Sequence, residues 1–168
     1  MAFSDVWKIF RSEDSSRLRG LVSSIKLKHK AYGIEIHPPA SAKAIRDFEK
    51  KIGFLLPVDF KNFYSICNGF GCTEDIFNII PLHEITIHEQ NYGQNWFYFS
   101  EYMIYCDMWL LEISADGTYT ILNASNRHLA LTNSLIEFLE RFLRGNVFDR
   151  GGLYDWQEEL KAGHHPSI

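Results

Sequence analysis

The apolar residues of this chain change their spacing twice, and this change constrains the fold more than any other feature of the sequence. Up to about residue 70 they recur three and four positions apart, which is the spacing of one helix face. From Gly71 they alternate with polar residues, as in half-buried strands, and from Ser134 the helical spacing returns. Helices, then sequential strands, then helices predict an α+β fold with a mostly antiparallel sheet and its helices packed on one face.

The first forty residues are predicted to form a helical N-terminal extension. Ser15 or Ser16 is a candidate N-cap, and Gly33 followed by Pro38-Pro39 ends the helical stretch. The apolar face of the helix is Leu18, Leu21, Val22 and Ile25. A chain of 168 residues fits one domain, so we expect a single domain made of an extension, residues 1–40, and a main α+β unit, residues 41–168.

Two short helices with clear start and stop signals come next. Ser41 is a good N-cap, and Gly53 supplies the left-handed residue that ends the first helix. Pro57 suits the first turn of the second helix, and Asn68-Gly69 closes it. The pair forms a compact helical hairpin before the strands begin.

Four strands are predicted in the middle of the chain, and helices follow them. The strands are residues 76–80, 96–100, 108–113 and 118–122. Asp116-Gly117 is a hairpin signal between the last two strands. Ser134 and Glu137 form a capping box for a helix that ends at Gly145, and Asp155 opens a last short helix.

The charges are distributed unevenly along the chain. Residues 1–60 carry a net charge of +4 (eleven Lys/Arg and seven Asp/Glu), and residues 61–168 carry −8 (six and fourteen). No Lys or Arg lies between Asn62 and Asn126, a stretch rich in acidic and aromatic residues. Such a surface favours a basic protein partner and disfavours nucleic acid, because the field attracts cations while Trp and Tyr fill pockets. The alternative is that the aromatic residues form core and the acidic residues only face solvent.

Within this stretch we select candidate protein-binding residues by charge and aromatic character. They are Glu74, Asp75, Trp96, Tyr98, Glu101, Tyr105, Asp107, Trp109 and Asp116.

The residues give no sign of catalysis, a metal site or a cofactor. His83 and His88 are five positions apart, so they do not share a helix or strand face as zinc ligands would. The three cysteines include no Cys-x-x-Cys pair, which predicts free thiols in a reducing compartment. The chain has no signal-like N-terminus and no apolar run of about 18 residues, so we expect a cytoplasmic protein without a membrane partner.

The stretch from Ser41 to Phe70 resembles the SUKH superfamily, which includes fungal cell-wall-assembly regulators and bacterial immunity proteins. The residues that carry the resemblance are Ile45, Phe48, Glu49, Gly53, Leu56, Pro57, Phe60, Phe63, Asn68 and Gly69. The similarity extends over about residues 40–145. It departs at Cys106-Asp107, where the family often has Gly-Asp. We expect Glu49 and Asp107 to support the fold by tying elements together through carboxylate hydrogen bonds.

The resemblance implies a non-catalytic module whose sheet docks another protein. Bacterial members commonly neutralise a cognate polymorphic toxin, often a nuclease or a deaminase, and many nuclease toxins are basic. The first hypothesis is therefore an immunity protein with a basic toxin domain as its partner. The alternatives are a regulatory scaffold with several weak partners, and an enzyme or small-ligand binder whose cleft is lined by Trp96, Tyr105 or Trp109. The oligomeric state stays open.

Overall fold

The computed structural model describes residues 3–74 and 76–163, with side chains from residue 13 onward. In chain order its elements are α1 (Phe3–Lys28), the 3-10 turn η1 (Lys30–Tyr32), β1 (Ile34–Ile36), α2 (Ala42–Ile52), α3 (Val58–Ile66), β2 (Phe70–Cys72), β3 (Phe77–Ile79), α4 (Leu82–Ile85), η2 (Glu89–Asn91), β4 (Trp96–Tyr102), β5 (Asp107–Ile113), β6 (Tyr119–Asn123), β7 (Asn126–Thr132), α5 (Leu135–Gly145) and α6 (Leu153–Gly163).

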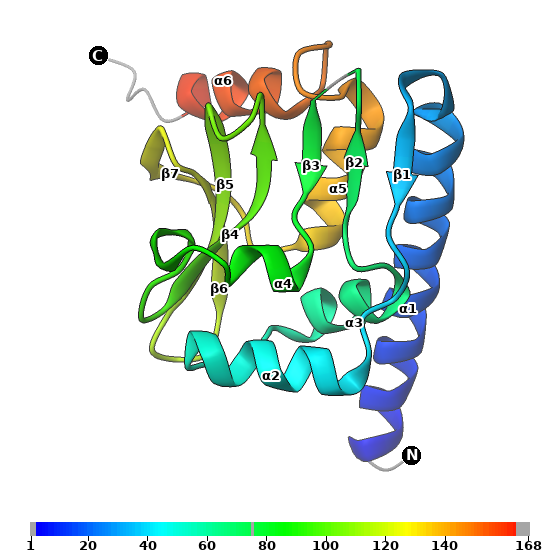
Figure 1. The fold of residues 1–168 in the computed structure, drawn as a ribbon, viewed down its shortest axis with the longest axis vertical. Helices are drawn as coiled ribbons and strands as arrows, with labels where there is room; N and C mark the ends of the chain where they lie inside the picture. The colour runs from blue at the N-terminus through cyan, green and yellow to red at the C-terminus, as the bar shows by residue number, and fades with distance from the viewer. Residues whose placement is uncertain (1–2, 75, 164–168) are drawn as a thin grey trace.

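The strands form one sheet in which every strand pairs with its neighbour in the sequence. The order is β1 to β7, and all six pairings are antiparallel. In Figure 1 α3 and α5 lie behind this sheet, while α1 runs along its β1 edge. The α+β class with a mostly antiparallel sheet is therefore confirmed.

Aromatic side chains fill the space between the sheet and the helices behind it. Phe99 of β4 contacts Phe60 of α3 and Phe138 of α5, with ring centroids 5.1 Å apart in each pair. Phe77 of β3 stacks on Phe142 of α5 at 4.2 Å. The inner face of the sheet is therefore buried against the helices. Its outer face and its two ends remain available to bind a partner.

The N-terminal extension contributes to this same core. Leu18 and Ile25 are fully buried, and Leu21 and Val22 are nearly so. The helix is longer than expected, because it begins at Phe3 and passes through Ser15 and Ser16. The N-cap predicted at these serines is wrong. No glycine or proline precedes them within the helix, so nothing forces a break, and a serine inside a helix costs little.

Three other start and stop signals, at Ser41, Gly53 and Ser134, hold in the structure. The Ser41 hydroxyl accepts a hydrogen bond from the Ala44 N–H, and the Ser134 hydroxyl accepts one from the Glu137 N–H. Gly53 is left-handed at φ 87°, as expected at the end of α2. Pro57 is the N-cap of α3 and so lies one position before its first turn. Asp155 was expected to open the last helix, but it lies inside α6, which begins at Leu153.

The hairpin predicted at Asp116-Gly117 joins β5 to β6, and Gly117 takes a positive φ of 82°. Four elements carried no recognised signal. The strands β1 and β2 have three residues each, too few to show an alternation, and α4 has four. The strand β7 pairs with β6 through two shifts in register, which interrupt the alternation.

Candidate functional site

One end of the sheet concentrates the strained backbone of the molecule. Among the described residues, five that are not glycine have a positive φ: Ile76, Met103, Ile104, Tyr105 and Asn146, at 50° to 63°. Three of them line a single pocket, where the β2–β3 turn, the β4–β5 hairpin and the α5–α6 connection meet, and the other two follow Met103 directly. Left-handed backbone costs an L-residue energy and collects at functional sites, so this end of the sheet is the first candidate.

The same end of the sheet exposes large apolar side chains. Ile104 is 77% exposed and Phe148 is 63% exposed. Ile76, Met103 and Tyr105 are 38%, 46% and 47% exposed. We call these five residues the hairpin-end patch. Apolar side chains gathered on a surface in this way mark an interaction site more often than scattered ones do.

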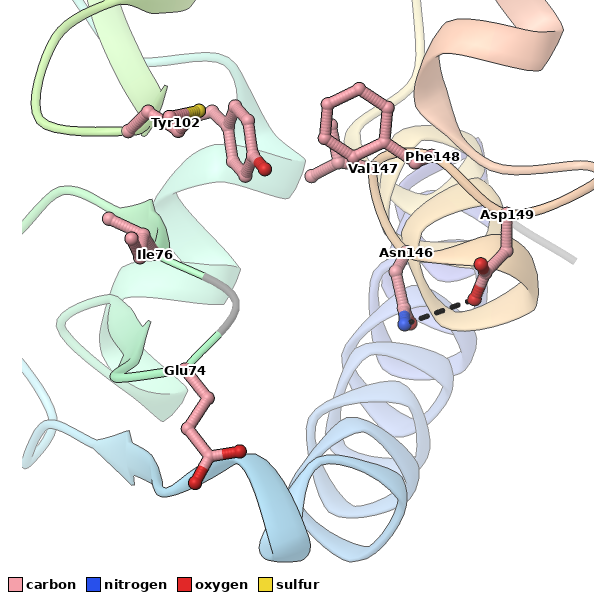
Figure 2. Close-up of a pocket in the computed structure, with 8 residues that line it drawn as sticks. Glu74, Ile76, Tyr102, Asn146, Val147, Phe148 and Asp149 are labelled. Atoms are coloured by element: carbon pink, nitrogen blue, oxygen red, sulfur yellow. Dashed lines mark hydrogen bonds between the residues drawn. The ribbon is translucent and has the colours of Figure 1, made fainter.

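A pocket of about 200 Å³ opens beside the patch (Figure 2). The rings of Tyr102 and Phe148 meet edge to face at 5.2 Å across one end of it. The carboxylate of Glu74 lies on the β2–β3 side, and that of Asp149, which Asn146 approaches at 3.4 Å, lies on the α5–α6 side. The pocket is smaller than the usual range of about 300–1,000 Å³ for small-molecule sites, so it fits one protruding side chain better than a cofactor.

Glu101 supports the hairpin that carries the patch. One of its carboxylate oxygens accepts a hydrogen bond from the Asn78 amide, and the other accepts one from the Tyr105 backbone N–H, both at 2.8 Å. Burial, followed by the negative charges of Glu101 and Glu84, raises the pKa of the Tyr105 hydroxyl. The tip is therefore held in place from the sheet and lies in a negative potential.

A second cluster lies at the other end of β4, on the outer face of the sheet. Arg127 of β7 places its guanidinium 4.8 Å from the ring centroid of Trp96 and donates a hydrogen bond to the Tyr98 hydroxyl. Beneath them Leu110 and Leu122 face each other in the register of β5 and β6 and are buried. Trp96 and Tyr98 thus reach the surface, but they lie six and four positions along β4 from its hairpin end at Tyr102 and shield an apolar layer.

Asp107 and Trp109 are directed inward. The Asp107 carboxylate accepts hydrogen bonds from Tyr154, Asn123 and Ser125, and so ties β5 to β6 and to α6. Trp109 is fully buried between Phe77 and Tyr154, so its side chain cannot contact a docked protein. For Trp109 the structure follows the alternative in which the aromatic residues form core.

The remaining predicted contact residues are separated from the patch. Asp116 lies in the exposed β5–β6 turn, where hydrogen bonds from Thr118 hold its pKa below the usual range. That turn is at the opposite end of β5 from the β4–β5 hairpin. Asp75 lies outside the described residues. Of the nine candidates, Glu74, Glu101 and Tyr105 therefore lie at the hairpin end of the sheet.

The signature residues of the helical hairpin hold the fold around them. Glu49 is buried; its carboxylate accepts the Leu56 N–H at 2.9 Å and pairs with Lys61 at 2.8 Å. The Asn68 side chain accepts the Leu82 N–H at 3.0 Å. Gly69 has a φ of 86°, and a Cβ there would lie 2.2 Å from the Ile79 carbonyl oxygen, so only glycine fits.

Five residues of the two surface clusters were missed by the sequence reasoning: Ile76, Met103, Ile104, Phe148 and Arg127. Phe148 and Ile76 join the patch only because the α5–α6 connection meets the β2–β3 turn. No local sequence pattern predicts that contact. Arg127 was passed over because it lies directly after the stretch that contains no Lys or Arg.

The described residues contain little that would support other chemistry. Burial raises the pKa of the Cys67 thiol to about 12, which removes it as a nucleophile. Within residues 3–74 and 76–163, no group of three His, Cys, Asp or Glu side chains could hold a metal ion. No helix in that part of the chain combines the length and apolar character needed to cross a membrane.

An α+β domain with an open sheet face and an exposed apolar, acidic end has the features of a protein-binding module. The chain belongs to the SMI1 / KNR4 family (SUKH-1), whose family model matches residues 39–141. The match confirms the resemblance to the SUKH superfamily and covers the span that carried it. Domains of this family bind protein partners and are generally non-catalytic, and the family includes immunity proteins. No curated protein matches the chain.

Proposed function

We propose that this protein is a cytoplasmic bacterial immunity protein that binds and neutralises a cognate toxin, of nuclease or deaminase type, through the hairpin-end patch and the carboxylates around it. It acts as an inhibitor and not as an enzyme, and its partner is a basic protein domain and not a nucleic acid or a membrane. The single observation that carries the proposal is the coincidence of exposed apolar side chains with left-handed backbone at one end of the sheet.

Strained, exposed residues are expensive for the fold, so they persist where binding uses them. Replacing any of Ile76, Met103 or Ile104 by a smaller polar residue or by glycine would lower the strain or the exposed apolar area. Ile104 is 77% exposed, so most of its side chain is free to contact a partner. Ile104 and Phe148 are therefore the expected anchors, each filling a hollow on the partner.

The acidic residues at this end of the sheet would orient a basic partner as it approaches. Glu74 and Asp149 line the pocket beside the patch, Glu101 accepts the Tyr105 N–H, and residues 62–126 contain no Lys or Arg. A basic partner would be drawn to this end before contact, which raises its association rate more than its final affinity.

The test is affinity capture from the native lysate with the full chain as bait, at low and at high salt. We expect one stoichiometric basic protein, which is lost with bait carrying Ile104→Gly or Glu74→Lys and retained with the matched charge variant Glu89→Lys on η2. A captured protein that both patch variants still bind would place the docking surface elsewhere. Several weak partners in place of one would favour the regulatory-scaffold hypothesis.

A further inference from the structure

A groove at the opposite end of the sheet from the hairpin-end patch has a different character. It lies between the second half of α2 and the loop that leads to α3, and is lined by Arg46, Glu49, Lys50, Gly53, Phe54 and Leu55. Figure 1 shows α2 at one end of the sheet and α6 at the other, so the groove is remote from the pocket of Figure 2. Its volume of about 560 Å³ is within the range of binding sites for small molecules and side chains.

The groove is positively charged, because two exposed cations, Arg46 and Lys50, line it beside one carboxylate, and that carboxylate is buried. This carboxylate belongs to Glu49 and pairs with Lys61. Arg46 and Lys50 are exposed and make no ion pair with any residue that the structure describes. One helical turn separates these two cations, so both can reach a single extended ligand.

One wall of the groove is apolar and rigid. Leu55 is 71% exposed, whereas Leu56 beside it is buried and has its N–H held by Glu49. Phe54 packs on Phe97 of β4, with ring centroids 6.1 Å apart, and Gly53 fixes the turn with a φ of 87°. The fold thus holds an exposed leucine in a fixed position beside two unpaired cations.

We infer that this groove binds an acidic peptide segment of a partner protein, with carboxylates on Arg46 and Lys50 and an apolar side chain against Leu55 and Phe54. Two cations beside one leucine in a concave site match a short acidic and apolar stretch. A nucleic-acid strand needs a longer cationic track and several exposed rings for its bases, whereas this groove offers two cations and the single half-buried ring of Phe54. A membrane surface needs several exposed apolar anchors, whereas Leu55 is, among the described residues, the one strongly exposed apolar side chain that lines this groove. The site is independent of the proposed toxin-binding function.

The experiment is an NMR titration of the ¹⁵N-labelled full chain with a short capped peptide of alternating glutamate and leucine. We expect saturable shifts of the Arg46, Lys50, Gly53 and Leu55 amide signals, and no comparable shifts at Tyr105. A glutamate–serine peptide should bind more weakly, and a lysine–leucine peptide should leave these signals in place. Arg46→Ala and Lys50→Ala should each raise the dissociation constant roughly threefold, as expected for one solvent-exposed ion pair.

The matched control is Lys26→Ala, which removes one exposed positive charge from α1 and should leave the affinity unchanged. The inference is overturned if the glutamate–leucine peptide gives no saturable shifts at the groove, or if Lys26→Ala weakens binding as much as Lys50→Ala. It is also overturned if a DNA duplex or phosphatidylserine vesicles shift the same signals at lower concentration than the peptide does.

Discussion

Glu101 accepts a hydrogen bond from the backbone N–H of Tyr105 at 2.8 Å, and this contact spans part of the β4–β5 hairpin that carries the patch. The bond runs from the last part of β4 to the third of three consecutive left-handed residues. The other carboxylate oxygen of Glu101 accepts a hydrogen bond from the Asn78 amide on β3. A strained tip is thereby fixed to two strands of the sheet, which orders Ile104 before any partner arrives.

Replacing Glu101 tests this support. Glu101→Gln keeps one acceptor oxygen but turns the other into a donor, so the side chain can no longer accept hydrogen bonds from both the Asn78 amide and the Tyr105 N–H. We expect a loss of about 1 kcal/mol in the free energy of unfolding, measured by urea titration, and faster hydrogen exchange at Tyr105. The matched variant Glu112→Gln, on the same face of the sheet, should change neither quantity. Unchanged exchange at Tyr105 in Glu101→Gln would show that the carboxylate does not hold the tip.

Relieving the strain at Ile104 should separate stability from binding. The left-handed region costs an L-residue about 1–2 kcal/mol, and glycine removes this strain. The greater freedom of glycine in the unfolded chain offsets about 0.5–1 kcal/mol of that gain in stability. Ile104→Gly is therefore expected to raise the free energy of unfolding by up to about 1 kcal/mol. Ile87→Gly, at an exposed position whose φ is negative, should lower it instead. A less stable Ile104→Gly protein in thermal or urea unfolding would mean that the side chain is retained for the fold.

The pH dependence of stability should carry a contribution from Asp59. Its carboxylate accepts hydrogen bonds from the Tyr119 hydroxyl and the Leu135 N–H, joining α3, β6 and α5, and burial raises its pKa above the ordinary 3.8. Between the unfolded and the folded pKa the native state binds more protons, so the contribution of this group to stability falls as the pH rises through that window.

Comparing the wild type with Asp59→Asn isolates the contribution of the Asp59 carboxyl to the pH dependence of the free energy of unfolding. Urea unfolding from pH 4 to pH 7 should show that the stability advantage of the wild type over the variant is largest at the acid end and shrinks toward neutrality. An advantage that grows with pH would mean that the folded-state pKa of Asp59 is lowered.

We propose that the N-terminal extension is an integral part of the single domain, because its apolar face enters the common core. Leu18→Ala should cost about 2–5 kcal/mol, as for other fully buried leucines. Leu27→Ala, at a position that is 76% exposed on the same helix, should cost almost nothing. Equal and small losses for the two variants in urea unfolding would show that α1 is only loosely attached.

Much of the fold could be predicted from the sequence because its signals are local. The Ser41 cap, the left-handed Gly53 and the turn at Gly117 each depend on residues within one turn of chain, and each is found in the structure. The strands β1 and β2 were missed because three-residue strands exist only through their pairing with each other and with β3. Pairing of that kind leaves no period to detect.

The site was predictable only in part, for a related reason. Composition identified Glu74, Glu101 and Tyr105 as acidic or aromatic residues of the sheet region, and they do gather at one end. It could not separate Trp109 from Trp96, because which face a strand residue occupies depends on register, and the bulge between Tyr98 and Ser100 shifts that register within β4.

The central claim is that the hairpin-end patch docks a basic toxin domain, and binding kinetics of the captured partner test it most directly. Association and dissociation rates would be measured by surface plasmon resonance over a range of salt concentrations for wild type, Glu74→Lys, Ile104→Gly and the control Glu89→Lys. We expect Glu74→Lys to slow association and flatten its salt dependence, and Ile104→Gly to speed dissociation, with Glu89→Lys close to wild type in dissociation. Identical rates for all four proteins would contradict the account.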